Sequence, residues 1–228
     1  MKPHENRAPQ LLGPAYTGVP KAEQVNCQFQ SVVFPADSRN PEFRKVMEAT
    51  GGIQIPATSP YSLWKSIDPQ IINKAVDARW SEGKFVRYQS DGNFYHKHNI
   101  MMREEGGHYV LEHDGALSQI IKSDKFCDFM KQISGKNLEP HEAHVLRMMP
   151  GDYLREHNHE RGNPIFVFHL AGDYQGGQYF DRCERTDRVQ IYNSQPHDIV
   201  LCRGDVTHGV LAVESGSRTA LVVSTRYA

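Results

Sequence analysis

Three histidines and one arginine in the last third of the chain have the types and spacing of a metal site beside an anion-binding group. His157 and His159 stand two residues apart, and because alternate residues of an extended segment point the same way, both imidazoles can face one point. His208 opens a later β-type run, and Arg218 follows ten residues on. Imidazole is a common metal ligand, and guanidinium grips carboxylates in a bidentate manner. The four side chains therefore predict a metal ion with an anionic ligand beside it.

Short strands must position these residues. After Pro140 the chain consists of apolar β-type runs separated by proline and glycine turn signals, a pattern that predicts a sandwich or barrel. A turn at Ser215-Gly216 is expected to fold the strand of Arg218 back beside the strand of His208. The predicted runs are residues 143–149, 165–170, 178–180, 189–192, 198–202, 206–213 and 219–225.

The first half of the chain is predicted to supply supporting helices. Helical periodicity occurs over residues 43–50, over 66 or 68 to 82, where Asp68 is a candidate N-cap, and over 123–133. Residues 85–95 and 101–111 alternate like short strands or loops. The expected fold class is α+β: an extended arm at 1–24, then one domain at 25–228. Within that domain, residues 25–140 give mostly helical support and 141–228 form the sheet core.

The composition excludes several classes of function. The chain has 228 residues, with 26 Lys and Arg against 27 Asp and Glu, and 12 His. This balance argues against a nucleic-acid partner or a polybasic membrane surface. No stretch resembles a signal peptide or a membrane span, and the four scattered cysteines contain no C-x-x-C pair. We expect a soluble cytoplasmic protein with reduced thiols and no membrane partner.

The order of these motifs resembles the iron(II)/2-oxoglutarate-dependent oxygenases. The resemblance is carried by residues 149–154, His157, residues 176–180, His208 and Arg218, and it spans roughly 143–226. It is closest to the prolyl-hydroxylase-like branch, which includes hydroxylases and halogenases of free amino acids. The resemblance implies a double-stranded β-helix, or jelly roll. It also implies iron(II) on His157 and His208, and the distal carboxylate of 2-oxoglutarate on Arg218.

The metal motif departs from the family pattern at its third ligand. The family carries Asp or Glu two residues after the first His, where this chain has His159. Halogenases have a small residue there, so His159 disfavours halogenation. Either His159 is the third ligand of a three-His site, or Glu160 reaches the metal after a local backbone distortion. Strand alternation favours His159.

A second departure concerns the co-substrate. Met148 stands where many relatives carry a Tyr that contacts 2-oxoglutarate, and Arg147 or Tyr153 are the candidates to replace it. Two other histidine pairs are assigned no chemistry: residues 96–98 are interpreted as a polar loop, and His141 and His144 as structural.

The predicted function is oxidation of an unactivated C–H bond by iron(II), 2-oxoglutarate and O2, with release of succinate and CO2. The expected partner is a small-molecule substrate, an amino acid or a derivative, and the outcome is hydroxylation, desaturation or ring closure. Two alternatives stay open: a three-His dioxygenase of cupin type without 2-oxoglutarate, and a non-catalytic jelly-roll binding protein. Arg218 argues against the cupin alternative, where it has no assigned task.

Overall fold

The computed structural model describes residues 52–90, 92–103, 110–159, 163–170, 172–183 and 188–227. The predicted arm at 1–24, the predicted helix at 43–50 and Glu160 lie outside these residues. The strands are β1 (Gly52–Ile55), β2 (Val86–Ser90), β3 (Asn93–Arg103), β4 (Val110–Glu112), β5 (Leu138–Met148), β6 (Leu154–His157), β7 (Pro164–His169), β8 (Tyr174–Gly176), β9 (Tyr179–Cys183), β10 (Arg188–Tyr192), β11 (Ile199–Arg203), β12 (Thr207–Val210), β13 (Val213–Gly216) and β14 (Arg218–Tyr227).

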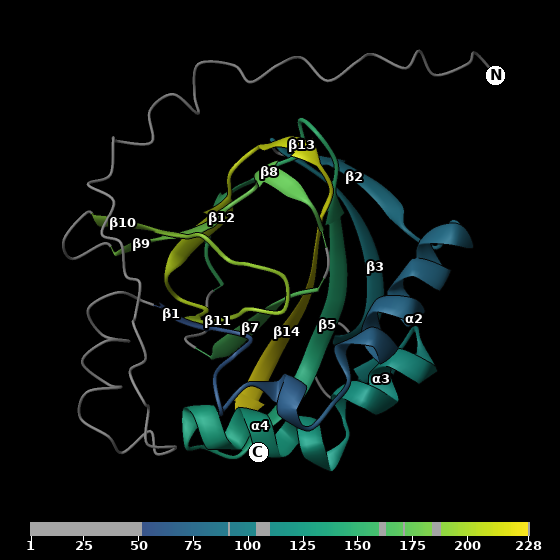
Figure 1. Ribbon diagram of the computed structural model, residues 1–228, viewed down its shortest axis with the longest axis vertical. Helices are drawn as coiled ribbons and strands as arrows, with labels where there is room; N and C mark the ends of the chain where they lie inside the picture. The colour runs from purple at the N-terminus through teal and green to yellow at the C-terminus, as the bar shows by residue number, and fades with distance from the viewer. Residues whose placement is uncertain are drawn as a thin grey trace.

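Two antiparallel sheets make up most of the molecule. The major sheet has eight strands in the order β1-β11-β7-β14-β5-β3-β2, with β4 added to β3. The minor sheet has the order β10-β9-β12-β6, and β8 and β13 form a separate pair. In Figure 1 the strands surround a central space, with the helices outside the major sheet. The predicted α+β jelly roll is thereby confirmed, and strands from both halves of the chain share the major sheet.

The pairing of the last strand differs from the expectation. Strand β14, which begins at Arg218, pairs with β5 and β7, whereas β12, which carries His208, pairs with β6 and β9. The prediction that these two strands lie side by side is wrong. Ser215 and Gly216 do not form a tight turn between them, because both residues belong to β13 and pair with β8. Arg218 and His208 therefore come from opposite sheets.

The helices form where the capping signals lie. Helix α2 (Pro69–Ser81) follows Asp68, whose side chain accepts a hydrogen bond from the Gln70 N–H at 2.9 Å. Helix α4 (Asp124–Ser134) ends at Gly135, which has a φ of 65°. Both helices were predicted. A shorter helix, α3 (Gly115–Ile121), and a 3-10 turn, η2 (Leu63–Lys65), were not, because seven and three residues are too few for a clear period.

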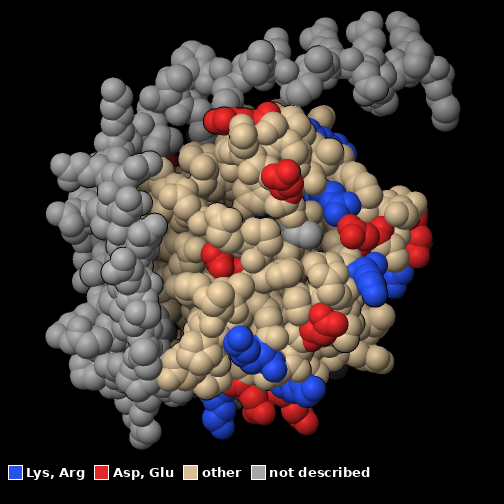
Figure 2. Space-filling model, in the orientation of Figure 1, with Lys and Arg blue, Asp and Glu red and all other residues tan. Residues whose placement is uncertain are grey.

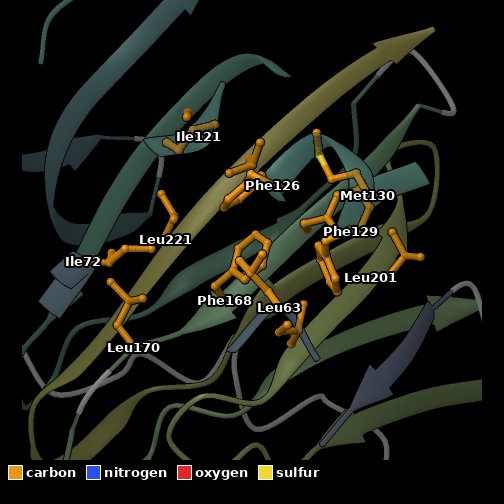
Figure 3. Packing of buried hydrophobic residues seen from close by; sticks show 14 of the residues in the cluster. Leu63, Ile72, Ile121, Phe126, Phe129, Met130, Phe168, Leu170, Leu201 and Leu221 are labelled. Carbon is orange, nitrogen blue, oxygen red and sulfur yellow. The ribbon is translucent and has the colours of Figure 1, made fainter. Parts of the chain in front are cut away.

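The main core lies between the outer face of the major sheet and the helices. Phe168 of β7 is fully buried, and its ring lies 5.1 Å from Phe126 and 6.0 Å from Phe129, centroid to centroid. Figure 3 shows these rings beside Leu63 and Met130. A second apolar cluster fills the space between the two sheets. The major sheet is thus covered on both faces, and its inner face is the one that can contribute to a site.

Residues 96–98 are part of strand β3, so the interpretation as a polar loop is wrong. His98 is buried, and its Nε2 donates to Asp114 Oδ2 at 3.1 Å on the helix side of the sheet. Lys97, between the two histidines, points toward the other face and lines the cavity described below. The polar residues of this strand are thus divided: His98 pairs with Asp114 in the interior, and Lys97 lies on the inner face of the sheet.

Asp114 links α2, β3 and α3 through its side-chain hydrogen bonds. Its buried carboxylate accepts from Arg79 Nε at 2.6 Å, from His98 and from the Leu117 N–H at 3.2 Å. Burial by itself raises the pKa of Asp114, but the hydrogen bonds from Arg79 and His98 outweigh it and lower the pKa to about 2.

Because this pKa is depressed in the folded state, Asp114 stabilises the protein above the unfolded-state pKa near 3.9. The contribution is lost as pH falls through about 2. We expect it to amount to about 2 kcal/mol. Urea unfolding of Asp114→Asn should show a deficit at pH 6 that shrinks between about pH 4 and pH 2. Asp128→Asn, at an exposed position on α4, is the matched control. A deficit independent of pH would contradict this role of the charge.

One face of the molecule, seen in Figure 2, carries mixed charge. On this face, Lys and Arg are interspersed with Asp and Glu, and the part that is not grey has no large patch of only positive or only negative charge (Figure 2). Within the described ranges, no helix has the length and apolar character needed to cross a membrane.

Candidate functional site

Three histidines converge at one end of the minor sheet. His208 on β12 is paired in register with His157 on β6, so the two side chains lie on the same face. His159 follows just after β6, and its N–H donates to the Gly204 carbonyl at 2.7 Å. The ring centroids are 4.4 Å apart for His157 and His208, 5.4 Å for His157 and His159, and 5.3 Å for His159 and His208. One nitrogen from each ring lies within 4.8 Å of the other two, a spacing that one metal ion can bridge.

Backbone carbonyls fix the tautomers of two of these rings. His157 Nδ1 lies 3.0 Å from the Arg155 carbonyl, and His208 Nδ1 lies 2.7 Å from the Val206 carbonyl. A carbonyl oxygen only accepts, so Nδ1 carries the proton in both rings. The Nε2 lone pair of each neutral imidazole is then free for a metal. The same second contact orients metal-bound histidines in general.

The surroundings of His159 and His208 favour the neutral form of both rings. Burial, reinforced by the neighbouring His157, lowers the pKa of His208 to about 3. Burial and the charge of His157 also lower the pKa of His159. Neutral imidazole is the form that binds metals, so the lowered pKa values of His159 and His208 suit both rings to a divalent cation.

Arg218 has the donors of an anion site and few partners for them. It is buried, with Nη1 3.7 Å from the Met148 sulfur and with Nε and Nη2 unpartnered among the described residues. Burial lowers its pKa, partly offset by Tyr174. A buried unpaired cation is costly, so these donors fit a carboxylate ligand. Gly177 has a φ of 65° and leaves room for the Arg218 side chain, because a Cβ at position 177 would lie only 3.2 Å from Arg218 Cδ.

The three histidines and Arg218 line one cavity of 180 Å³ between the sheets. The histidines come from the minor sheet and Arg218 from the inner face of the major sheet. Tyr179, from the predicted 176–180 motif, packs its ring 5.7 Å from His208 and donates to the Cys202 sulfur at 2.9 Å. The structure thus brings the four main predicted residues together.

Arg147 and Tyr153 do not reach this cavity. Arg147 faces α2, where it pairs with Asp77 at 2.7 Å and lies 4.7 Å above the Trp80 ring. Tyr153 packs against Phe94, with ring centroids 5.2 Å apart. Neither is among the described residues that line the cavity. Glu160, the alternative third ligand, lies outside the described residues.

The 149–154 motif has a supporting task. Asp152 is buried, accepts a hydrogen bond from the Met149 N–H at 2.9 Å and pairs with Arg87 at 2.7 Å. These contacts close the turn before β6 and so fix the start of the strand that ends at His157.

Sequence reasoning missed four polar residues of the cavity. They lie on the inner faces of β3 and β5, where alternation could have located them once both segments were taken as strands. These residues are Tyr95, Lys97, Glu142 and His144. Burial, with a smaller effect of Tyr88, raises the pKa of Tyr95 to about 12, so this phenol is a neutral wall of the cavity.

The comparisons with known proteins identify the fold. No protein-family model and no curated protein sequence matches the chain. Among solved structures, an oxidoreductase of the 2OG-Fe(II) oxygenase family from Burkholderia pseudomallei is similar, with a TM-score of 0.63 and 14% identity, over 81% of this chain and 89% of that one.

Two further structures agree. A Pseudomonas putida prolyl-4-hydroxylase has a TM-score of 0.58 and 16% identity, over 81% of this chain and 96% of the other. SnoK, a non-heme alpha-ketoglutarate-dependent carbocyclase from nogalamycin biosynthesis, has a TM-score of 0.60 and 13% identity, over 84% and 86%. The chain therefore has the fold of the 2-oxoglutarate- and iron(II)-dependent oxygenases.

Proposed function

We propose that this protein is an iron(II)- and 2-oxoglutarate-dependent oxygenase of a small molecule. The observation that carries the proposal is one cavity that holds both a three-imidazole cluster and a buried Arg with unpartnered donors. A metal-binding protein alone has no need of the second feature, and an anion-binding protein alone has no need of the first. The similarity in fold to oxygenases of this class supports the same assignment.

In this proposal, His157, His208 and His159 hold the metal. The Nδ1 contacts of His157 and His208 direct Nε2 toward it, and the histidine spacing supports His159 as the third ligand. A site of three neutral imidazoles leaves the full charge of the divalent ion uncompensated by protein ligands, which favours an anionic co-substrate. Glu160 is the alternative third ligand.

Arg218 binds the distal carboxylate of 2-oxoglutarate through its free Nε and Nη2. The buried apolar surroundings strengthen this ion pair and leave it dry. Iron(II) at the histidines would supply the chemistry with O2 that couples decarboxylation of 2-oxoglutarate to oxidation of a substrate C–H bond. The Tyr179 ring covers His208 and keeps water from that side of the imidazole.

The substrate is a small molecule, and we include an amino acid or derivative in the proposal. The cavity of 180 Å³ lies below the roughly 300–1,000 Å³ of pockets for drug-sized ligands. Hydroxylation, desaturation and ring closure all begin with the same kind of step, the oxidation of a C–H bond of the substrate. The proposal places the enzyme in the cytoplasm, in agreement with the free thiols of Cys127 and Cys202.

Succinate formation tests the proposal. The purified protein with iron(II), 2-oxoglutarate and O2 should release succinate slowly even without a substrate, and chelation of the metal should stop it. A protein that consumes O2 but never yields succinate would favour the cupin alternative. A protein that binds neither metal nor 2-oxoglutarate would favour the non-catalytic jelly roll.

A further inference from the structure

The cavity contains two more charged side chains besides Arg218. Lys97 on β3 and Glu142 on β5 both line it, on the inner face of the major sheet. Arg218 pairs in register with Met148, whereas Glu142 pairs with Ser224, near the other end of the same two strands. Glu142 stands six positions before Met148 on β5, roughly 20 Å at the rise of a strand, and Lys97 pairs with Leu146 between them. Charged groups therefore occur at several positions along the inner face of the major sheet.

Lys97 occupies a position that packing alone would give to an apolar residue. Its neighbour across the sheet is Leu146, which also lines the cavity. Burial lowers the pKa of Lys97, and Glu142 partly restores it. Among the described residues, the Lys97 ammonium has no hydrogen-bond or ion-pair partner within the usual limits. A half-buried ammonium without a partner carries a desolvation cost, which an anionic ligand in the cavity would offset.

Glu142 is the complementary case. The His144 ring lies beside it, with Nδ1 3.8 Å from Glu142 Oε1, too far for a hydrogen bond. Burial, together with the charge of Lys97, holds the pKa of His144 well below its usual range, so this ring is neutral. Glu142 thus faces the cavity with no cation from the described part of the chain bonded to it, while its side chain stays one-third exposed.

We propose that Lys97 and Glu142 form a subsite for a zwitterion, in which Lys97 binds the carboxylate of the substrate and Glu142 binds its ammonium group. This inference rests on the proposed function, because the subsite selects the substrate of the same cavity. A free amino acid carries both groups on one carbon, so both contacts can form together. Its side chain can then extend along the cavity toward the histidines, where the apolar Leu154 and Val210 form the wall.

Calorimetric titration of the Zn(II)-loaded protein tests the subsite without turnover. The proteinogenic L-amino acids are the probes, with and without 2-oxoglutarate. For the tightest binder, two analogues are added: the amine that lacks its carboxylate and the acid that lacks its ammonium group. We expect each analogue to bind about 10- to 100-fold more weakly than the amino acid, the loss expected for one charge-assisted contact.

Two variants assign each contact. Lys97→Met should weaken binding of the amino acid by a similar factor and leave binding of the amine unchanged, because the amine has no carboxylate for Lys97 to contact. Glu142→Gln should weaken the amino acid and leave the deaminated acid unchanged. Lys84→Met and Glu139→Gln, at exposed positions near β2 and on β5, are the matched controls and should match the unsubstituted protein. Circular dichroism checks that all four variants fold.

The inference is overturned if no amino acid binds, or if Lys97→Met weakens the amine as much as the amino acid. It is also overturned if Glu142→Gln changes Zn(II) affinity and not amino-acid affinity, since the carboxylate would then act on the metal. Substrate-free succinate formation should be retained in the control variants Lys84→Met and Glu139→Gln, whose positions lie outside the cavity. Loss of that reaction in the unsubstituted protein counts against the proposed function and leaves the binding test intact.

Discussion

Replacement of His157 or His208 by Ala is expected to abolish metal binding and succinate formation. Each variant removes an imidazole whose Nε2 is directed into the cavity by a contact to a backbone carbonyl. Loss of an outer contact to a metal ligand typically costs about 10- to 100-fold in affinity, so loss of the ligand itself should cost more than about 100-fold. Competition with a chromogenic chelator measures the affinity, and His113→Ala, at an exposed position between β4 and α3, is the control.

The same measurement identifies the third ligand. His159→Ala should lower metal affinity nearly as much as His157→Ala, because one nitrogen of His159 lies within 4.8 Å of those of His157 and His208. Glu160→Ala should then have little effect. If the order is reversed, and Glu160→Ala alone abolishes binding, the site has a carboxylate ligand and the three-imidazole arrangement is wrong.

Replacement of Arg218 by Met is expected to raise the dissociation constant of 2-oxoglutarate by more than about 100-fold. The estimate follows from two hydrogen bonds between charged groups, at about 1.5–3 kcal/mol each. Arg218→Lys keeps the charge but loses the planar pair of donors, so its effect should be intermediate. Calorimetric titration with 2-oxoglutarate measures both, and Arg226→Met, at the exposed end of the same strand, is the control.

The effect of Arg218→Met on stability should have the opposite sign. Among the described residues, the Arg218 guanidinium is buried with two unpartnered nitrogens, and replacement of such a group by an apolar side chain is often neutral or stabilising. We therefore expect urea unfolding of the ligand-free variant to occur at the same or a higher midpoint. A strongly destabilised variant would mean that Arg218 has a structural partner, and would weaken its assignment as a co-substrate anchor.

Local signals predicted the elements that local chemistry determines. Asp68 and Gly135 mark ends of α2 and α4 because capping depends on one residue and its immediate neighbours. The histidines and Arg218 were found because their spacing and glycine context survive in the sequence even when the pairing of strands is unknown. The histidines and Arg218 lie in one cavity because the two sheets face each other, and this does not depend on which strands are neighbours.

Strand β3 could not be predicted with the same ease. An inner strand is expected to be apolar, but here His98 is balanced by Asp114 on one face, while Lys97 faces the cavity on the other. Asp114 lies 16 residues from His98, and the cavity that Lys97 faces is formed largely by other strands, so the local sequence looks like a loop. The pairing of β14 with β5 and β7 likewise depends on competition among many strands, and the turn signal at Ser215-Gly216 could not decide it.

The cavity is divided between the two sheets, and each sheet carries a different set of polar side chains. The imidazoles belong to β12 and to the end of β6, whereas Arg218, Lys97 and Glu142 belong to β14, β3 and β5. No ladder of hydrogen bonds joins the two groups directly among the described strands. Substitutions at the imidazoles can therefore be combined with substitutions at Arg218, Lys97 and Glu142 without a change to the strand pairing that holds the other group.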